Sequence, residues 1–144
     1  RYTLLGDLSE IQLPPWTPSP TRQSNLWETT CFEFFLGVRS AEPYWEFNLS
    51  PSGHWNVYRF TGYRQGMETE TAITTLPFDI QTEADAVSLV LELDLTPILA
   101  KTSALEMGIT TVVQSQDGTL SHWAIAHPGP KADFHDRKGF VLAL

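Results

Sequence analysis

Apolar and polar residues alternate with a period of two along many short stretches of this chain. Side chains on a strand point to the two faces of a sheet in turn, so this period predicts strands. Residues typical of turns separate the stretches, as in Ser-Pro-Ser-Gly at 50–53 and Gln-Asp-Gly-Thr at 116–119. The predicted strands span residues 1–5, 30–36, 44–49, 55–60, 69–75, 78–82, 86–95, 105–114, 120–126 and 139–144.

Strands at a spacing of about ten residues predict an all-β protein, an antiparallel β-sandwich with two sheets of the jelly-roll or immunoglobulin-like kind. A parallel sheet needs crossover helices, for which the chain has no room. Thr96 as N-cap with Pro97 after it predicts at most one short helix, near 96–101. The length of 144 residues predicts a single domain, 1–144. Since residue 1 already lies in a predicted strand, whether another strand precedes it stays open.

The two faces of the predicted strand 44–49 differ in chemistry. Tyr44, Glu46 and Asn48 share one face, and three large apolar residues share the other. The apolar face is typical of a core. The face with a carboxylate and an amide beside an aromatic ring is typical of a surface that binds a polar ligand with a flat apolar side.

The net charge of the chain disfavours some classes of binding partner. The net charge is −8, from nine Lys and Arg against seventeen Asp and Glu, which disfavours nucleic acid and anionic membrane surfaces as partners. No apolar run approaches the roughly 20 residues of a membrane-spanning helix. Cys31 is the one cysteine, and its apolar strand predicts an inert core thiol. A single cysteine and the absence of a visible signal peptide favour the cytoplasm.

Three segments together carry a family resemblance: 26–36, 44–60 and 122–144. The first two resemble the paired strands of DOMON-like domains, which are β-sandwich ligand binders. Within that group the chain resembles the family 9 carbohydrate-binding modules, where a tryptophan precedes a strand bearing a glutamate, a hairpin follows, and a second tryptophan lies near the final strand. Members of the wider superfamily bind sugars or haem, so the resemblance implies the fold more firmly than the ligand.

Carried over to this sequence, the resemblance implies a non-catalytic sugar site. Trp27 and Trp123 would be its two aromatic walls, and Glu33 and Arg59 would bond the hydroxyls. An amide from Asn48 or Asn56 would join them. The segment 120–125 departs from the family, because it lacks the amide residues expected around the second tryptophan.

The residues alone support the same hypothesis. Sugars offer C–H patches to aromatic faces and hydroxyls to planar polar groups. Glu33 lies in an apolar strand and needs a partner, for which Arg59 is the natural choice, either as a structural ion pair or as part of a pocket. The ligand is thus predicted to be a saccharide, with no cofactor and no metal. The predicted site residues are Trp27, Glu33, Glu46, Asn48, Arg59 and Trp123.

Two other functions stay open. A haem-binding domain would hold haem b between a methionine, Met67 or Met107, and a histidine of the loose cluster at 122–136. That cluster matches no zinc-ligand spacing. A glycoside hydrolase would use Glu33 and Glu46, if they face the same way on neighbouring strands, as paired carboxylates.

Overall fold

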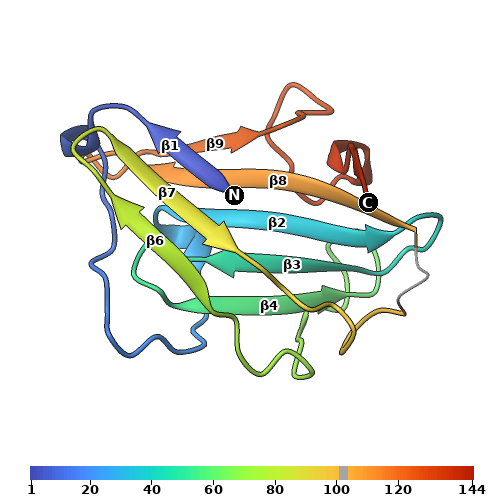
Figure 1. The fold of residues 1–144 in the computed structure, drawn as a ribbon. Coiled ribbons are helices and arrows are strands. Elements are labelled where there is room, and N and C mark those ends of the chain that lie inside the picture. Colours follow the sequence, from blue (N-terminus) through green and yellow to red (C-terminus); the bar gives the residue numbers. More distant parts are fainter. Residues whose placement is uncertain (101–103) are drawn as a thin grey trace.

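The computed structural model describes residues 1–100 and 104–144 and confirms the predicted all-β sandwich of two antiparallel sheets (Figure 1). The small sheet has the order β1 (Tyr2–Leu5), β7 (Ala86–Leu91), β6 (Phe78–Thr82). The large sheet has the order β10 (Leu142–Ala143), β8 (Leu105–Gln114), β2 (Cys31–Val38), β3 (Tyr44–Leu49), β4 (Trp55–Phe60), β5 (Glu68–Thr69), and β9 (Leu120–Ala124) also pairs with β8.

Two predicted strands are shorter than expected, because their ends have nothing to pair with. β7 stops at Leu91, where its partner β6 begins at Phe78, so the predicted strand to residue 95 was too long. The predicted strand 69–75 was largely wrong. Only Glu68–Thr69 pairs with β4, and the Glu70 carboxylate then accepts a hydrogen bond from the backbone N–H of Ala72, which bends the chain away.

Short 3-10 turns span Leu8–Glu10, Leu26–Glu28 and Arg137–Gly139. In the region of the predicted short helix, the backbone N–H groups of Ile98 and Leu99 both donate to the carbonyl of Leu95, which makes a single turn. The end of that predicted helix, beyond residue 100, lies outside the described residues.

The inner face of the large sheet, which meets the small sheet, forms the main core. Its rings and branched side chains interdigitate with those of β7, as in other sandwiches. Phe34 and Phe47, from adjacent strands, stack with ring centroids 4.2 Å apart. The buried residues of this core include Phe32, Phe34, Leu36, Trp45, Phe47, Leu49, Trp55, Val57, Val87 and Leu89.

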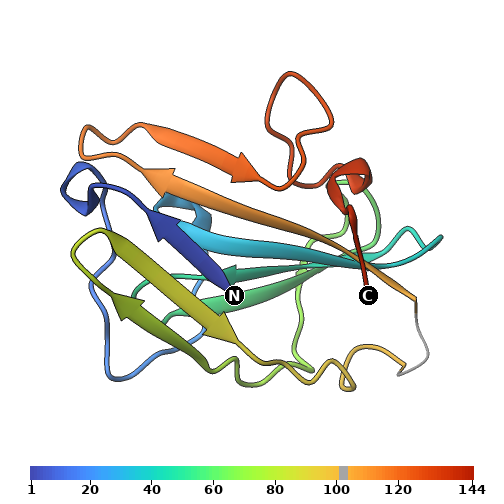
Figure 2. The same ribbon diagram turned by 45° about the horizontal axis from the view of Figure 1, so that its top comes forward.

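The outer face of the large sheet has no second sheet over it. Figure 2 shows the small sheet on one side of the large sheet and the loop that follows β9 on the other. Glu33 and Glu46 share this outer face, which the sequence had left open: Glu33 pairs with Asn48, and Glu46 pairs with Tyr58. Cys31 is fully buried on the same face, and burial raises the pKa of its thiol well above the ordinary value, as expected of an inert core thiol.

Candidate functional site

A cavity of about 420 Å³ lies between the outer face of the large sheet and the loops that cover it. Its volume is in the range of ordinary small-ligand pockets. Strands β2, β3, β4, β8 and β9 and the covering loops all contribute to it. The lining residues are Trp27, Glu33, Phe35, Glu46, Phe60, Arg64, Met67, Val112, His122, Ala132, Phe134 and His135.

Glu33 on β2 is the most unusual side chain of the cavity, with only 2% of its surface exposed. Its Oε2 lies 3.5 Å from the hydroxyl of Thr110, at the limit of a hydrogen bond. Its Oε1 is buried and has no hydrogen-bond partner among the residues that the structure describes. Burial, and then the nearby Glu46, raise the pKa of Glu33 well above its ordinary value, so this carboxyl favours its protonated form.

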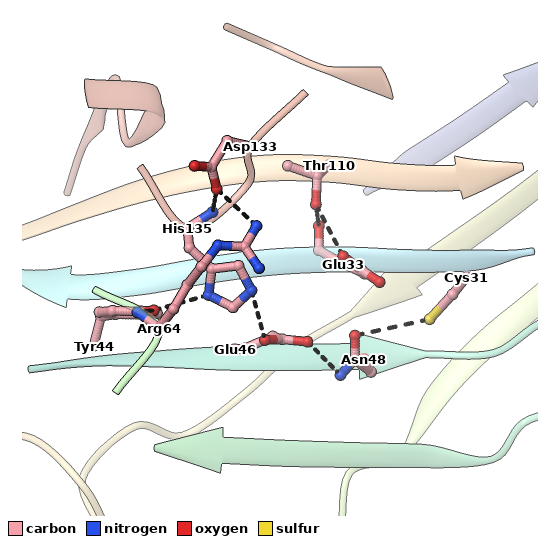
Figure 3. Close-up of polar contacts among 9 residues, drawn as sticks. All are labelled: Cys31, Glu33, Tyr44, Glu46, Asn48, Arg64, Thr110, Asp133 and His135. Atoms are coloured by element: carbon pink, nitrogen blue, oxygen red, sulfur yellow. Dashed lines mark hydrogen bonds and ion pairs between the residues drawn. The ribbon is translucent and has the colours of Figure 1, made fainter. Parts of the chain in front are cut away.

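Glu46 on β3 lies diagonally from Glu33 across the strand pair (Figure 3). Its Oε1 accepts a hydrogen bond of 2.9 Å from Asn48, and its Oε2 lies 3.8 Å from Nε2 of His135. Burial raises the pKa of Glu46 to about 7, although the Asn48 hydrogen bond and the charge of Arg64 oppose the shift. Near neutral pH this carboxyl therefore changes readily between its two forms.

His135 covers Glu46 from the loop after β9. Its ring meets Phe35 and Phe60 edge-on, each with centroids 5.1 Å away, and its Nδ1 lies 2.8 Å from the hydroxyl of Tyr44. Burial, and then the charge of Arg64, lower the pKa of His135 to about 4. The imidazole is consequently neutral near pH 7, and its contact with Glu46 is a polar contact rather than an ion pair.

Arg64 lies in the loop after β4 and reaches across the cavity wall to Asp133 (Figure 3). Its guanidinium donates to the Asp133 carboxylate at 2.9 Å. Tyr63 donates to the same carboxylate. Although burial raises it, the hydrogen bonds from Tyr63 and Arg64 hold the pKa of Asp133 below its ordinary value. The positive charge of Arg64 is thus balanced within this chain.

Aromatic rings form the rest of the wall. Trp27 reaches the cavity from the 3-10 turn Leu26–Glu28 and packs edge-on against Tyr58, with centroids 5.7 Å apart. Phe134 faces it from the covering loop, and Phe35 and Phe60 rise from the sheet. The structure therefore places Trp27, Glu33 and Glu46 together, as the sequence predicted. Their role in binding stays a prediction.

Arg59 lies elsewhere, and its predicted pairing with Glu33 was wrong. Arg59 pairs in register with Trp45 and so points to the inner side of the sheet, away from Glu33. Its side chain is exposed. Arg64, five residues later, is the arginine that lines the cavity. Arg64 lies in a loop, which has no strand alternation from which the direction of a side chain could be inferred.

Trp123 also lies on the wrong side of its strand for the predicted role. It pairs with Thr111, which places it on the inner side at the edge of the sheet, 63% exposed and donating from its indole N–H to Ser121. Its neighbour His122 pairs with Val112 and lines the cavity instead. The prediction that Trp27 and Trp123 form opposed walls of one site is wrong. Neighbouring residues of a strand point to opposite faces of the sheet, and Trp123 lies on the face away from the cavity.

The two candidate amides are bonded within the chain. Asn48 is fully buried and supports Glu46 from beside it. Asn56 accepts a hydrogen bond of 2.7 Å from Arg22 and donates to the carbonyl of Gln23 at 2.8 Å. Neither residue is among those that line the cavity. Asn48 thus positions a lining carboxyl.

The proposed haem ligands do not fit the cavity well. Met67 and His122 line it, whereas Met107 lines a separate apolar cavity of about 220 Å³ between the sheets. Haem needs an apolar slot between its ligands, and here the floor carries Glu33 and Glu46. Over residues 1–100 and 104–144, no group of three or more His, Cys, Asp or Glu side chains could hold a metal ion. Within the same residues, no helix is long and apolar enough to cross a membrane.

Comparison with known proteins supports the fold. No protein-family model matches the chain. No curated protein sequence matches it. A solved structure from Bacteroides uniformis, of a protein whose proposed role is carbohydrate binding, superposes with a TM-score of 0.57 at 12% identity. The alignment covers 97% of this chain and 66% of that structure, so the chain spans slightly less than two thirds of its neighbour's length. The chain therefore shares its fold with that structure.

Proposed function

We propose that this chain is a non-catalytic binding module and that a saccharide occupies the cavity above Glu33 and Glu46. The observation that carries the proposal is the juxtaposition of two buried carboxyl groups with Trp27 and three phenylalanines around a single cavity. The resemblance to DOMON-like domains and family 9 modules points the same way. So does the neighbouring structure with its proposed carbohydrate-binding role.

The chemistry of a sugar ring suits these groups. A sugar ring is apolar on its C–H faces and polar at its rim. Trp27, at the mouth, offers an indole for the C–H face. Glu33 has an oxygen with no partner among the described residues, which can bond a hydroxyl without breaking an existing contact. Glu46, held in place by Asn48, offers the second polar contact.

Binding is favoured over hydrolysis by the ionisation of the two carboxyl groups. Glu33 and Glu46 do share a face on neighbouring strands, as the hydrolase hypothesis required. A glycosidase, however, needs one carboxyl protonated and the other ionised at its working pH. Here burial raises the pKa of both, to about 7 for Glu46 and well above the ordinary value for Glu33. Below about pH 7 both carboxyl groups therefore favour the protonated form, and neither is held ionised for the second role.

Titration with a panel of monosaccharides and disaccharides, followed by tryptophan fluorescence and calorimetry, tests the proposal. We expect binding to the wild type, a loss of about tenfold or more in Trp27→Ala, and no change in Trp123→Ala, since truncating a stacked aromatic commonly costs over 1.4 kcal/mol. Failure of every sugar to bind, or full binding by Trp27→Ala, would overturn it. Haem b titration checks the rival function: a Soret band lost in Met67→Ala would favour haem.

A further inference from the structure

The cavity has more acidic groups than free basic ones. Glu33 comes from β2 and Glu46 from β3. The basic groups that line it, within the described residues, are Arg64, His122 and His135. Of these, Arg64 is already paired with Asp133 at 2.9 Å. His135 is neutral near pH 7 and shares a hydrogen bond with Tyr44.

Neither buried acid therefore has a charged ion-pair partner of its own among the described residues, although the charge of Arg64, which is paired with Asp133, still acts on Glu46. The nearest polar contacts of Glu33 and Glu46 are a hydroxyl from Thr110, an amide from Asn48 and a neutral imidazole from His135. A buried carboxylate is costly unless a positive charge compensates it. Oε1 of Glu33, on a side chain 2% exposed, has no partner in the described part of the chain and belongs to a cavity wall. Both acids therefore favour their neutral forms below about pH 7, and a ligand that carries a positive charge would stabilise the ionised form.

The walls suit a positive charge as well. Trp27, Phe35, Phe60 and Phe134 surround the space above the two carboxyl groups. The faces of aromatic rings attract cations, and the attraction grows when the site excludes water. A cluster of rings beside two acids is a usual composition for recognising an ammonium group, whereas a neutral sugar needs no such excess of acid.

We propose that the saccharide bound here is an amino sugar, with its protonated amine lying between Glu33 and Glu46 among the aromatic rings. This inference rests on the proposed saccharide function and narrows it to a ligand class. Uronic acids and other anionic sugars would be rejected by the same carboxyl groups. N-acetylated sugars would lose the charge that the site recognises.

Binding of the amine would be coupled to the release of a proton. Below about pH 7 the carboxyl group of Glu46 is largely protonated. An ammonium beside it favours the carboxylate, so the O–H bond of the acid breaks and its proton passes to the buffer, while the amine keeps its own proton. The other charged or titratable groups near this carboxyl are Cys31, Glu33, Tyr44, Arg64 and His135. An uncharged sugar would release no proton.

Calorimetry with the glucosamine disaccharide and its N-acetylated counterpart tests the inference. We expect the amino form to bind about tenfold more tightly, the lower end for a charge-assisted hydrogen bond. At about pH 6, in two buffers of different ionisation enthalpy, its binding heat should reveal proton release. Glu46→Gln and Glu33→Gln should each reduce the preference. Glu83→Gln is the matched control, because Glu83 is exposed at the end of the small sheet, away from the cavity.

The outcomes separate the two proposals. Equal or tighter binding of the N-acetylated disaccharide, or amine binding without proton release, would overturn the amino-sugar inference and leave a saccharide site. Full preference in both Gln variants would overturn it too. No binding by either disaccharide or by the sugar panel would overturn both proposals. The comparison of the two disaccharides and the proton measurement both use the wild type. They therefore test the amino-sugar inference even if a variant fails to fold.

Discussion

The two faces of the large sheet are built from the same strands and behave in opposite ways. The inner face is closely packed with apolar side chains: Phe34 and Phe47 stack, and the apolar residues beside them contact the small sheet. The outer face buries Glu33 and Glu46, and the contact of Glu46 with His135 is to a neutral ring, while the charge of Arg64 is shared with Asp133. A protein interior tolerates such groups only at a cost in stability. The outer face therefore carries a cost in stability that the inner face does not.

The covering of each face explains the contrast. A sheet packed on a sheet leaves about 10 Å for side chains and fills it completely. Over the outer face lie a 3-10 turn, with Trp27, and the loop carrying Phe134 and His135, and they leave about 420 Å³. Loops adapt their path more freely than strands do, so cavities and binding residues gather where loops form the cover.

The largest expected effect comes from damaging the inner face. Phe47→Ala removes a fully buried ring that stacks on Phe34 and should lower the free energy of unfolding by about 3–5 kcal/mol. Urea denaturation measures it. Phe134→Ala, which truncates a half-buried cavity ring on a loop, is the matched variant and should lose much less. Similar losses in the two variants would contradict the division between a packed face and a binding face.

The next largest expected effect is on the outer face, where substituting a buried side chain should raise the free energy of unfolding at high pH instead of lowering it. With its pKa raised to about 7, folded Glu46 keeps a proton that the unfolded chain releases near pH 4.5. The folded state binds more protons between those values, so stability falls as pH rises through them, by about 3 kcal/mol in all. Glu46→Gln removes this loss and should be more stable than the wild type at about pH 8.

Urea midpoints at about pH 5 and pH 8 check this prediction, with Glu83→Gln as control. Glu33, whose pKa is also raised, adds a slope of the same sign. His135 opposes both: its pKa is lowered to about 4, so its contribution to stability falls as pH falls from 6.5 towards 4. The difference between wild type and Glu46→Gln cancels the His135 contribution, and it includes the part of the Glu33 slope that Glu46 causes, which has the same sign. A difference that does not change with pH would show that Glu46 is not shifted.

A smaller effect is expected from Arg64, whose charge acts on the pKa of Glu46. Arg64→Gln breaks the partly exposed bridge to Asp133, which should cost at most about 1 kcal/mol of stability. The charge of Arg64 also lowers the pKa of Glu46, so the variant should titrate Glu46 at higher pH than the wild type. NMR titration of the Glu46 carboxyl measures the shift. A Glu46 pKa that stays unchanged or falls would mean that Arg64 does not influence the carboxyl.

The sequence predicted which face of the sheet a strand residue occupies better than it predicted which residues contact one another. Period-two alternation placed Glu46 and Asn48 on one face, because that pattern depends only on the geometry of a single strand, and it left open whether Glu33 on the neighbouring strand shared that face. The predicted pairing of Arg59 with Glu33 was wrong because Arg59 was chosen by its charge alone. Its position in the strand places it on the opposite face of the sheet. The cavity wall from His135 and Phe134 could not be foreseen, since a loop has no period from which to infer its path over the sheet.

The smallest expected effect tests the corrected place of Trp123. A large exposed aromatic near a sheet edge is easily taken for a binding residue, and His122 beside it would be passed over. Trp123→Ala should change stability by no more than about 0.5 kcal/mol and leave sugar binding intact, because the ring is 63% exposed and points to the inner side of its strand. His122→Ala, one residue earlier, should weaken binding of the same ligand. If Trp123→Ala lost the ligand and His122→Ala kept it, the register of β9 against β8 would be shifted by one residue, and the outer cavity would have Trp123 as its wall.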